Sequence, residues 1–172
     1  MLNTLSGRFL ALTTIFVMLA EVLIFVPSVA RYRVDYLTDR LERAQIASLA
    51  LLADDMLTSD LERELLENAE VYNVVLRRDE VRQLVLSSPI PEPISATFDM
   101  RDSGAVVLIH DALKRLFTPG SQVIRVIGAP VRDAGLLIEV TMETGPLRDS
   151  MIDFGLRILI LSAVISAFTS SP

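Results

Sequence analysis

Two long apolar runs, one near each end of the chain, dominate the pattern of hydrophobic and polar positions. The first run covers 9–30 and contains a single charged residue, Glu21. A helix rises about 1.5 Å per residue, so a run of this length can cross a hydrocarbon layer roughly 30 Å thick. We therefore predict a cytoplasmic tail at 1–8 and a transmembrane helix at 9–30.

The same run has some features of a cleaved signal peptide. Arg8 precedes it, and Ser28-Val29-Ala30 resembles the small residues before a cleavage site. The apolar stretch is longer than the usual signal-peptide core of about 7–15 residues, and Glu21 lies inside it. We therefore favour a helix that is retained in the membrane.

The second apolar run extends from Phe154 to Phe168 and carries no charge after Arg157. The charge-free part is shorter than the roughly 20 residues that a span needs. Either Arg157 reaches up to the membrane interface, or the sequence ends inside the span. We favour the second alternative and predict a truncated transmembrane helix at 154–172.

The segment between these runs, 31–153, carries nearly all of the charge and is net acidic. A loop of this length can be translocated as a folded domain whatever its charge. A short N-terminal tail is more easily kept in the cytoplasm, so we expect this segment outside it. The predicted location is the bacterial inner membrane, with two passes and a periplasmic middle domain.

Within the middle segment the pattern alternates between helical and strand-like spacing, which predicts an α+β fold with a small antiparallel sheet. A capping-box pattern at Ser59-Asp60-Leu61-Glu62 marks one helix start, and Gly145-Pro146 marks another. Prolines at 89, 91 and 93 predict an extended connector. The expected helices are 31–57, 59–69, 103–117 and one from 145 onward, and the expected strands are 71–76, 81–86, 97–100, 122–127 and 136–142.

Composition excludes several classes of chemistry. The chain has no cysteine, one histidine and a formal charge of −6, which argues against thiolate chemistry and a nucleic-acid partner. No metal site or catalytic residue is predicted. Asp54-Asp55 could meet a divalent cation, but we favour a solvated helix end.

Five stretches of the chain resemble the N-terminal transmembrane and periplasmic sensor region of alphaproteobacterial-type two-component sensor histidine kinases. They are FLALTTIFVMLAEVLIFVPSVARYR, IASLALLA, VVLRRDEVRQLVLSSP, IRVIGAP and LRDSMIDFGLRILILSAVIS. The resemblance implies a PAS-like sensor domain, a homodimer, contact with membrane lipid, and a response regulator reached through a kinase region outside these residues. ATP and Mg²⁺ are expected only for that region, and no cofactor is expected here. His110 lacks the H-E-x-x-x-P context of a phosphoacceptor.

Two groups of residues are candidates for signal relay. Thr14, Glu21 and Ser28 recur every seven residues, which places them on one face of a supercoiling helix. A carboxylate at this depth is expected to be protonated, paired or turned toward protein, so Glu21 predicts a dimer contact or a contact between the two spans. The seam Val34, Leu37, Leu41 and Ala44 predicts either a dimer interface or a helix packed on its own sheet.

Four further residues are candidates for ligand binding. Arg101, Arg125 and Arg132 could hold an anionic ligand, as PAS-like sensors do, and solvated or ion-paired side chains are the alternative. His110 could bind a metal or respond to pH, and a half-exposed structural histidine is the alternative that we favour. The function predicted is detection of an extracytoplasmic signal and its relay to a kinase. The alternatives are the input region of a chemoreceptor or cyclase receptor, a tethered scaffold that senses nothing, and an anchored periplasmic enzyme.

Overall fold

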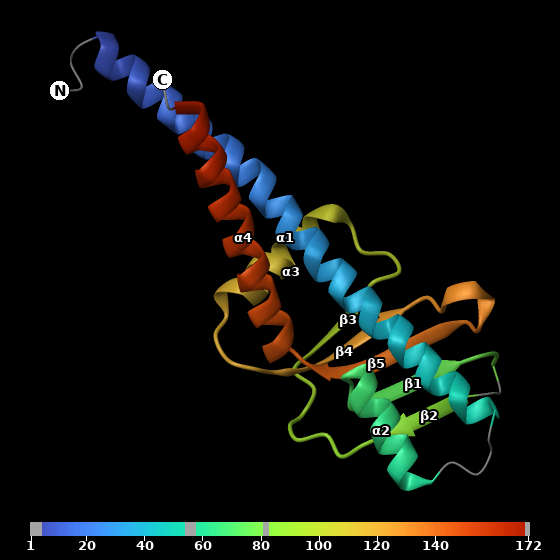
Figure 1. Cartoon of the computed structure of the whole chain (residues 1–172). Helices are drawn as coiled ribbons and strands as arrows, with labels where there is room; N and C mark the ends of the chain where they lie inside the picture. The colour runs from blue at the N-terminus through green and yellow to red at the C-terminus, as the bar shows by residue number, and fades with distance from the viewer. Residues whose placement is uncertain (1–4, 54–57, 81–82, 171–172) are drawn as a thin grey trace.

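The computed structural model describes residues 5–53, 58–80 and 83–170 (Figure 1). The predicted α+β class is confirmed. The elements in chain order are α1 (Leu5–Ala53), α2 (Ser59–Ala69), β1 (Asn73–Arg77), β2 (Gln83–Ser87), β3 (Ala96–Asp99), α3 (Ala105–Phe117), β4 (Val123–Gly128), the 3-10 turn η1 (Val131–Asp133), β5 (Leu137–Glu143) and α4 (Gly145–Ser170). The Asp54-Asp55 pair, at the end of the predicted helix 31–57, lies outside the described residues. So does Val81, the first residue of the predicted strand 81–86.

The strands form one five-stranded sheet in the order β2-β1-β5-β4-β3. Both predicted strand pairs, β1 with β2 and β4 with β5, are antiparallel, and β1 also pairs with β5. The prediction of an antiparallel sheet is wrong at one edge, because β3 runs parallel to β4. The helix α3 connects these two strands as a crossover, which returns the chain in the same direction.

The first helix is a single element of 49 residues. The predicted transmembrane helix and the predicted domain helix from residue 31 are therefore one unbroken rod, which crosses the sheet with its C-terminal half (Figure 1). Pro27 lies inside the rod without ending it. The N-terminal half of α1 and the part that packs on the sheet therefore share one helical backbone.

The hydrophobic core lies between the C-terminal half of α1 and the sheet. Leu37 and Ala44 are fully buried, and Leu41 is nearly so. A Cβ atom at Gly128 on β4 would lie 2.5 Å from Cδ1 of Leu41, so glycine allows the close approach of helix and strand. From the sheet, alternate residues of β1, β4 and β5 complete the core: Val74, Leu76, Ile124, Val126, Ile138, Val140 and Met142.

The second helix is capped differently from the prediction. The N-cap is Thr58, whose side-chain oxygen accepts a hydrogen bond from the backbone N–H of Leu61 at 3.4 Å. Ser59, the predicted cap, is the first residue of the helix instead. Leu66 is buried against the core, whereas Leu61 on the predicted apolar face is 42% exposed. The capping-box pattern therefore located the helix start to within one residue but misassigned the cap.

The last helix leaves the end of β5 and returns along α1 (Figure 1). The rings of Tyr32 on α1 and Phe154 on α4 stack with centroids 4.4 Å apart. At the next residue of α4, a Cβ atom on Gly155 would lie 3.1 Å from the Phe25 ring, which shows how closely the helices approach there. The two helices are thus packed together where they leave the domain.

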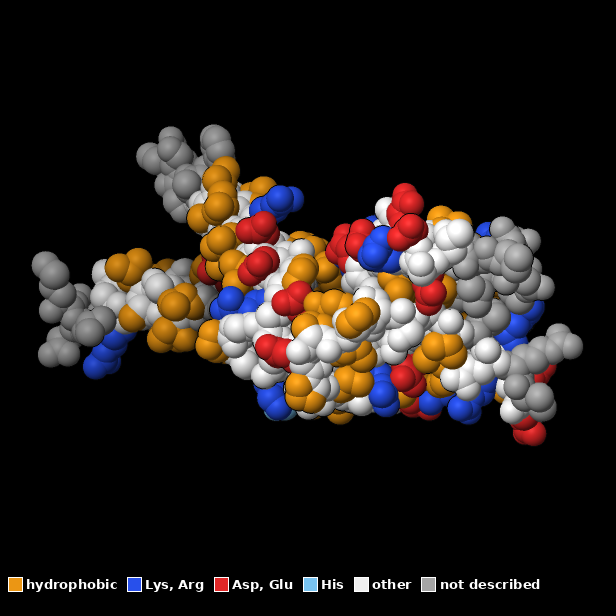
Figure 2. All heavy atoms as spheres, turned by 90° about the horizontal axis from the view of Figure 1, so that it is seen from below, with side chains coloured by type: hydrophobic (Ala, Val, Ile, Leu, Met, Phe, Trp, Pro, Cys, Tyr) orange, Lys and Arg blue, Asp and Glu red, His pale blue; other side chains and the backbone are white. Residues whose placement is uncertain are grey.

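Charged and apolar side chains are distributed unequally between the domain and the projecting helices (Figure 2). Acidic and basic side chains are spread over the domain, whereas the N-terminal half of α1 exposes large apolar side chains such as Phe9, Phe16 and Leu23. By length and composition, α1 could cross a membrane. Within the described residues α4 does not meet the same criterion.

Candidate functional site

Glu21 makes a contact between the two apolar helices. The hydroxyl of Ser162 on α4 donates a hydrogen bond to Oε1 of Glu21 at 3.0 Å. A cavity of about 260 Å³ adjoins this pair and is lined by apolar residues and by Ser166. The side chain of Glu21 is thereby turned toward protein, as expected for a carboxyl group in an apolar helix. Of the two contacts predicted for Glu21, the one between helices of the same chain is present in this structure.

The two other members of the seven-residue stripe bond within α1 itself. The Thr14 hydroxyl donates to the backbone oxygen of Leu10 at 2.9 Å, and the Ser28 hydroxyl donates to that of Ile24 at 2.7 Å. Such bonds satisfy a hydroxyl inside a helix without a partner helix. Within the stripe, the recorded contact with α4 is therefore that of Glu21.

The seam predicted on the following part of α1 packs on the chain's own sheet. Leu37, Leu41 and Ala44 belong to the hydrophobic core, whereas Val34 is half-buried and faces the first turns of α3. Side chains that are covered by β4 and β5 are not available to a second copy. Of the two interpretations left open for this seam, the structure favours the helix packed on its own domain.

Two of the four predicted ligand-binding residues are already engaged in ion pairs. Arg101 donates from Nε and Nη2 to the Asp99 carboxylate at 2.9 and 2.6 Å, and these bonds hold the pKa of Asp99 down to about 2. Arg125 on β4 lies 2.8 Å from the Glu139 carboxylate on β5. Because each guanidinium already has an acidic partner, neither is poised to take a ligand.

The other two candidates are exposed. His110 on α3 lies with Nδ1 3.5 Å from the Asp111 carboxylate. Arg132 is in the turn η1, where its φ of 57° places it in the left-handed region. The four candidates come from the bend after β3, from β4, from η1 and from α3, and none of them lines the two cavities described next. The structure does not bring them together as one site.

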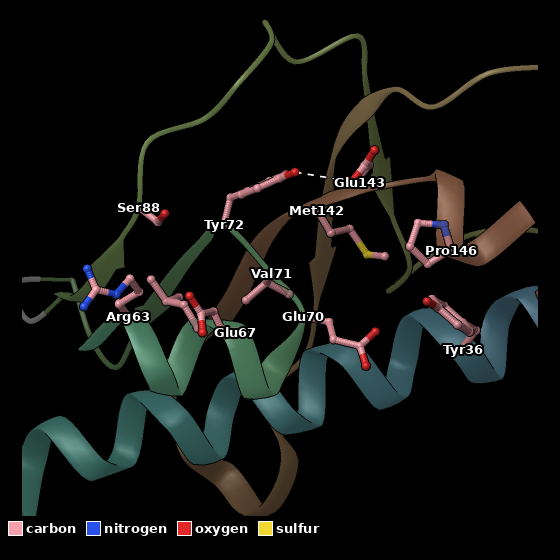
Figure 3. A pocket seen from close by; sticks show the side chains of 11 residues that line it. Tyr36, Arg63, Glu67, Glu70, Val71, Tyr72, Ser88, Met142, Glu143 and Pro146 are labelled. Atoms are coloured by element: carbon pink, nitrogen blue, oxygen red, sulfur yellow. Dashed lines mark hydrogen bonds between the residues drawn. The ribbon is translucent and has the colours of Figure 1, made fainter. Parts of the chain in front are cut away.

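One cavity of about 350 Å³ lies between α1, α2 and the ends of β1 and β5 (Figure 3). Its polar lining is mainly acidic, with Glu67, Glu70 and Glu143 against one basic residue, Arg63. Tyr72 points across the cavity and donates to Glu143 at 3.3 Å. Burial and the neighbouring Glu143 carboxylate raise the pKa of Tyr72 above its usual range. This cavity is electrostatically unsuited to an anion.

Beneath this acidic cavity, α1 contributes a buried cation that has an acidic partner, although its Nε atom has no hydrogen-bond partner within the described residues. The Arg40 guanidinium is 7% exposed and bonds to the Glu70 carboxylate and, at 3.0 Å, to the Tyr36 hydroxyl. It also lies 4.5 Å from the centre of the Tyr36 ring. A buried charge with these partners ties α1 to the end of α2.

A second cavity, of about 310 Å³, adjoins α1 at Arg33 and lies between α3, the β3–β4 edge and the start of α4. Its lining includes Arg33, Lys114 and Arg115 and one acidic residue, Asp111. Arg33 and Arg115 are 2% and 8% exposed. This concentration of basic groups was missed from the sequence. The signal was the spacing of Arg33 and Arg40 with Leu37 and Ala44 along one helix face, which places both arginines among core positions.

Comparison with known proteins gives no relative from which a role could be transferred. No family model, no curated protein and no solved structure matches the chain. Within the part of the chain that the structure describes, no group of three or more His, Asp or Glu residues could hold a metal ion.

Proposed function

We propose that this chain is the input region of a bacterial membrane-bound two-component sensor histidine kinase. In this proposal α1 and α4 both cross the inner membrane, and the domain between them is a PAS-like sensor on the periplasmic side. The domain detects a signal and passes it to a cytoplasmic kinase region as motion of the two helices. ATP, Mg²⁺ and a response regulator would be needed only by that kinase region.

The observation that carries the proposal is the continuity of α1. One helix contributes Leu37 and Ala44 to the core of the domain and also contributes the exposed apolar stretch around Phe16 and Leu23. A large exposed apolar surface is unfavourable in water and favourable in lipid. A rod with one half in each environment transmits any shift of the domain to the membrane without a flexible joint.

The placement of α4 supports a two-pass arrangement. The start of α1 and the end of α4 project from the same side of the domain (Figure 1). The Ser162–Glu21 hydrogen bond and the Tyr32–Phe154 stack hold the helices together at two levels. An interhelical hydrogen bond in a membrane contributes on average about 0.6 kcal/mol, weak enough for a signal to overcome.

The mechanism we propose is a shift between two packings of α1 against α4. A stimulus that binds one packing more tightly changes their populations by its difference in affinity. A homodimer would bring a second pair of helices alongside the first. Because Leu37, Leu41 and Ala44 face the chain's own sheet, such a dimer would use other faces of α1.

Other receptors with the same arrangement, such as chemoreceptors and cyclase receptors, remain the alternative within this class. A tethered scaffold is the alternative outside it. A scaffold needs no exchange between helix packings, so it predicts that the Glu21 contact is dispensable. The sensor proposal predicts that replacing Glu21 by Leu changes signalling output, whereas Val22→Leu, at a 56% exposed position, leaves it unchanged.

The topology is tested directly because the chain has no cysteine. Single cysteines are placed at Asp79, in the exposed turn after β1, and at Ser6, before the apolar stretch. In intact spheroplasts we expect a membrane-impermeant maleimide to label Asp79→Cys but not Ser6→Cys, and to label both after lysis. Labelling of Asp79→Cys only after lysis would contradict the sensor proposal.

A further inference from the structure

Two buried arginines on one face of α1 have opposite surroundings. Arg40 is paired with Glu70 and Tyr36, as described above. Arg33, two turns earlier and 2% exposed, has no ion pair recorded within the described residues. Its Nε and Nη1 atoms are buried and have no hydrogen-bond partner there. A buried, charged donor without an acceptor is strongly unfavourable, so these two atoms point to an anionic partner from outside the chain.

The residues around Arg33 hold its guanidinium group in place but do not neutralise its positive charge. The guanidinium lies 4.6 Å from the centre of the Phe98 ring on β3, a cation–π contact that also fixes its plane. Asp111 is the nearby acidic group, but it contributes from beyond ion-pair distance. Burial lowers the pKa of Arg33, and the Asp111 charge only partly offsets this.

A second buried arginine enters the same cavity from α3. Arg115 donates through Nη2 to the backbone oxygens of Thr118, at 3.2 Å, and of Gly120. Its Nε is buried and unpartnered. Burial and the neighbouring Arg148 lower the pKa of Arg115. The exposed Lys114, one residue earlier, adds a third positive charge at the cavity wall.

The cavity has the size and the walls of a small-molecule site. Its volume of about 310 Å³ is at the lower end of the range of roughly 300–1,000 Å³ seen for ligand pockets. Apolar wall is supplied by Ala96, Ile124 and Leu147, which would contact a carbon skeleton. Gln122 and Thr144 add polar groups, and they are fixed by a hydrogen bond from the Gln122 backbone N–H to the Thr144 hydroxyl at 2.9 Å.

We propose that this cavity binds a small organic carboxylate, with Arg33 as the principal anchor and Arg115 and Lys114 as auxiliary cations. A planar carboxylate can accept two parallel bonds from a guanidinium fork, and the apolar walls favour an organic anion over a hydrated inorganic one. The three cations outnumber Asp111, so the lining of the cavity is net positive.

Binding at this place would connect the helices that enter the membrane. Arg33 lies three residues after Ala30, the end of the predicted span, and Leu147 lies in the first turn of α4. A carboxylate bound in this cavity would therefore contact α1 through Arg33 and lie beside the first turn of α4. That the bound carboxylate is the stimulus of a sensor rests on the proposed function, whereas the binding itself does not.

The experiment uses the full chain in lipid-free detergent micelles and measures its melting temperature by differential scanning calorimetry. The probes are acetate, succinate and benzoate, with inorganic phosphate and choline as comparisons at constant ionic strength. We expect at least one carboxylate to raise the melting temperature in a concentration-dependent way, with phosphate and choline having smaller effects. Absence of a shift with every carboxylate, or an equal shift with phosphate, would overturn the assignment.

Variants separate the site from a general salt effect. In Arg33→Met we expect the ligand-free melting temperature to rise, because an unpaired buried charge is removed, and the carboxylate shift to disappear. Lys114→Met, at an exposed position that does not endanger folding, should weaken the shift several-fold. The matched control Arg132→Gln, at an exposed arginine outside the cavity, should retain the full shift.

A carboxylate shift that persists in Arg33→Met would refute the proposed anchor. The maleimide experiment above is independent of this one. A chain that binds carboxylate while Asp79 faces the cytoplasm would keep the site and lose the sensor proposal.

Discussion

The two halves of α1 share one helical backbone but have opposite surface patterns. In the N-terminal half Leu23 is 65% exposed, and large apolar side chains surround the helix. In the C-terminal half Leu37 is fully buried, and exposed polar residues such as Thr38 and Glu42 cover the other face. A helix that is apolar all round fits lipid, and one with a single apolar face fits the surface of a sheet.

The comparison also explains where arginine is tolerated. Arg31 ends the apolar half and is exposed, whereas Arg33 and Arg40 occupy core-facing positions two turns apart. Arg40 has partners from α1 and α2, and Arg33 has none recorded in the described residues. The stability of the fold explains why Arg40 can be buried, because Glu70 compensates its charge. It does not explain why Arg33 is buried, and we therefore assign Arg33 to a ligand.

The largest expected effect comes from the same substitution in each half. Leu37→Ala removes a fully buried side chain from the core and should lower the free energy of unfolding of the domain by about 2–5 kcal/mol. Leu23→Ala, at a 65% exposed position, should change it by less than about 0.5 kcal/mol. Pulse proteolysis in detergent measures both. Equal losses would contradict the assignment of the two halves to different environments.

A smaller effect is expected where the C-terminal half touches the sheet. Gly128→Ala places a Cβ atom 2.5 Å from Cδ1 of Leu41, so the side chain or the helix must move. We expect a loss of about 1–3 kcal/mol in the free energy of unfolding. In the background Leu41→Val, which lacks that Cδ1 atom, the loss should be smaller. A double-mutant cycle without coupling would contradict the close packing of α1 on β4.

In the N-terminal half, loss of a single polar contact should have a modest effect. Ser162→Ala removes the donor to Glu21 and should weaken the pairing of α1 and α4 by about 0.6 kcal/mol. Thr14→Ala should leave the pairing unchanged, since that hydroxyl bonds to Leu10 of its own helix. Distances between spin labels at Val17→Cys and Val164→Cys report on the pairing. Equal broadening of the distance distribution by both variants would contradict a role of the Ser162–Glu21 hydrogen bond in pairing α1 with α4.

The smallest effect lies away from α1, at the exposed pair Asp99 and Arg101. The pKa of Asp99 is lowered from 3.8 to about 2 in the folded chain, so its stabilising contribution is present above pH 3.8. It is lost as the pH falls toward 2, and the melting temperature should fall slightly over that interval. Arg101→Gln should abolish this component. An NMR titration of the Asp99 carboxyl at its ordinary value would contradict the prediction.

Local patterns predicted most of the elements, because periodicity and turn residues act over short distances. The helix start at Gly145-Pro146 and both antiparallel strand pairs are examples. The parallel β3–β4 pair was not predicted, because it depends on where α3 returns the chain. Likewise, Ser162 could not be identified as the partner of Glu21, since 141 positions separate them.

The candidate site was predicted less well, for a physical reason. Arginines on strands and in turns, such as Arg101 and Arg125, were selected by type, but their neighbours neutralise them. Arg33 is not a ligand candidate from the sequence alone, because arginine is usually solvent-exposed. The burial of Arg33 depends on how α1 is rotated relative to the sheet. The spacing of Leu37 and Ala44 indicates this rotation only if Arg33 and Arg40 are included in the same buried face of the helix.

The most direct test of the account is a scan of single cysteines along α1 in native membranes, labelled with a water-soluble maleimide. The proposed membrane placement predicts uniform protection over 9–26, on every face of the helix, whether lipid or α4 covers that face. Over 29–48 we predict protection with helical periodicity, with labelling at exposed positions such as Thr38, Glu42 and Ile46. Periodic labelling in both segments would mean that water reaches the N-terminal half too, and would contradict the central claim.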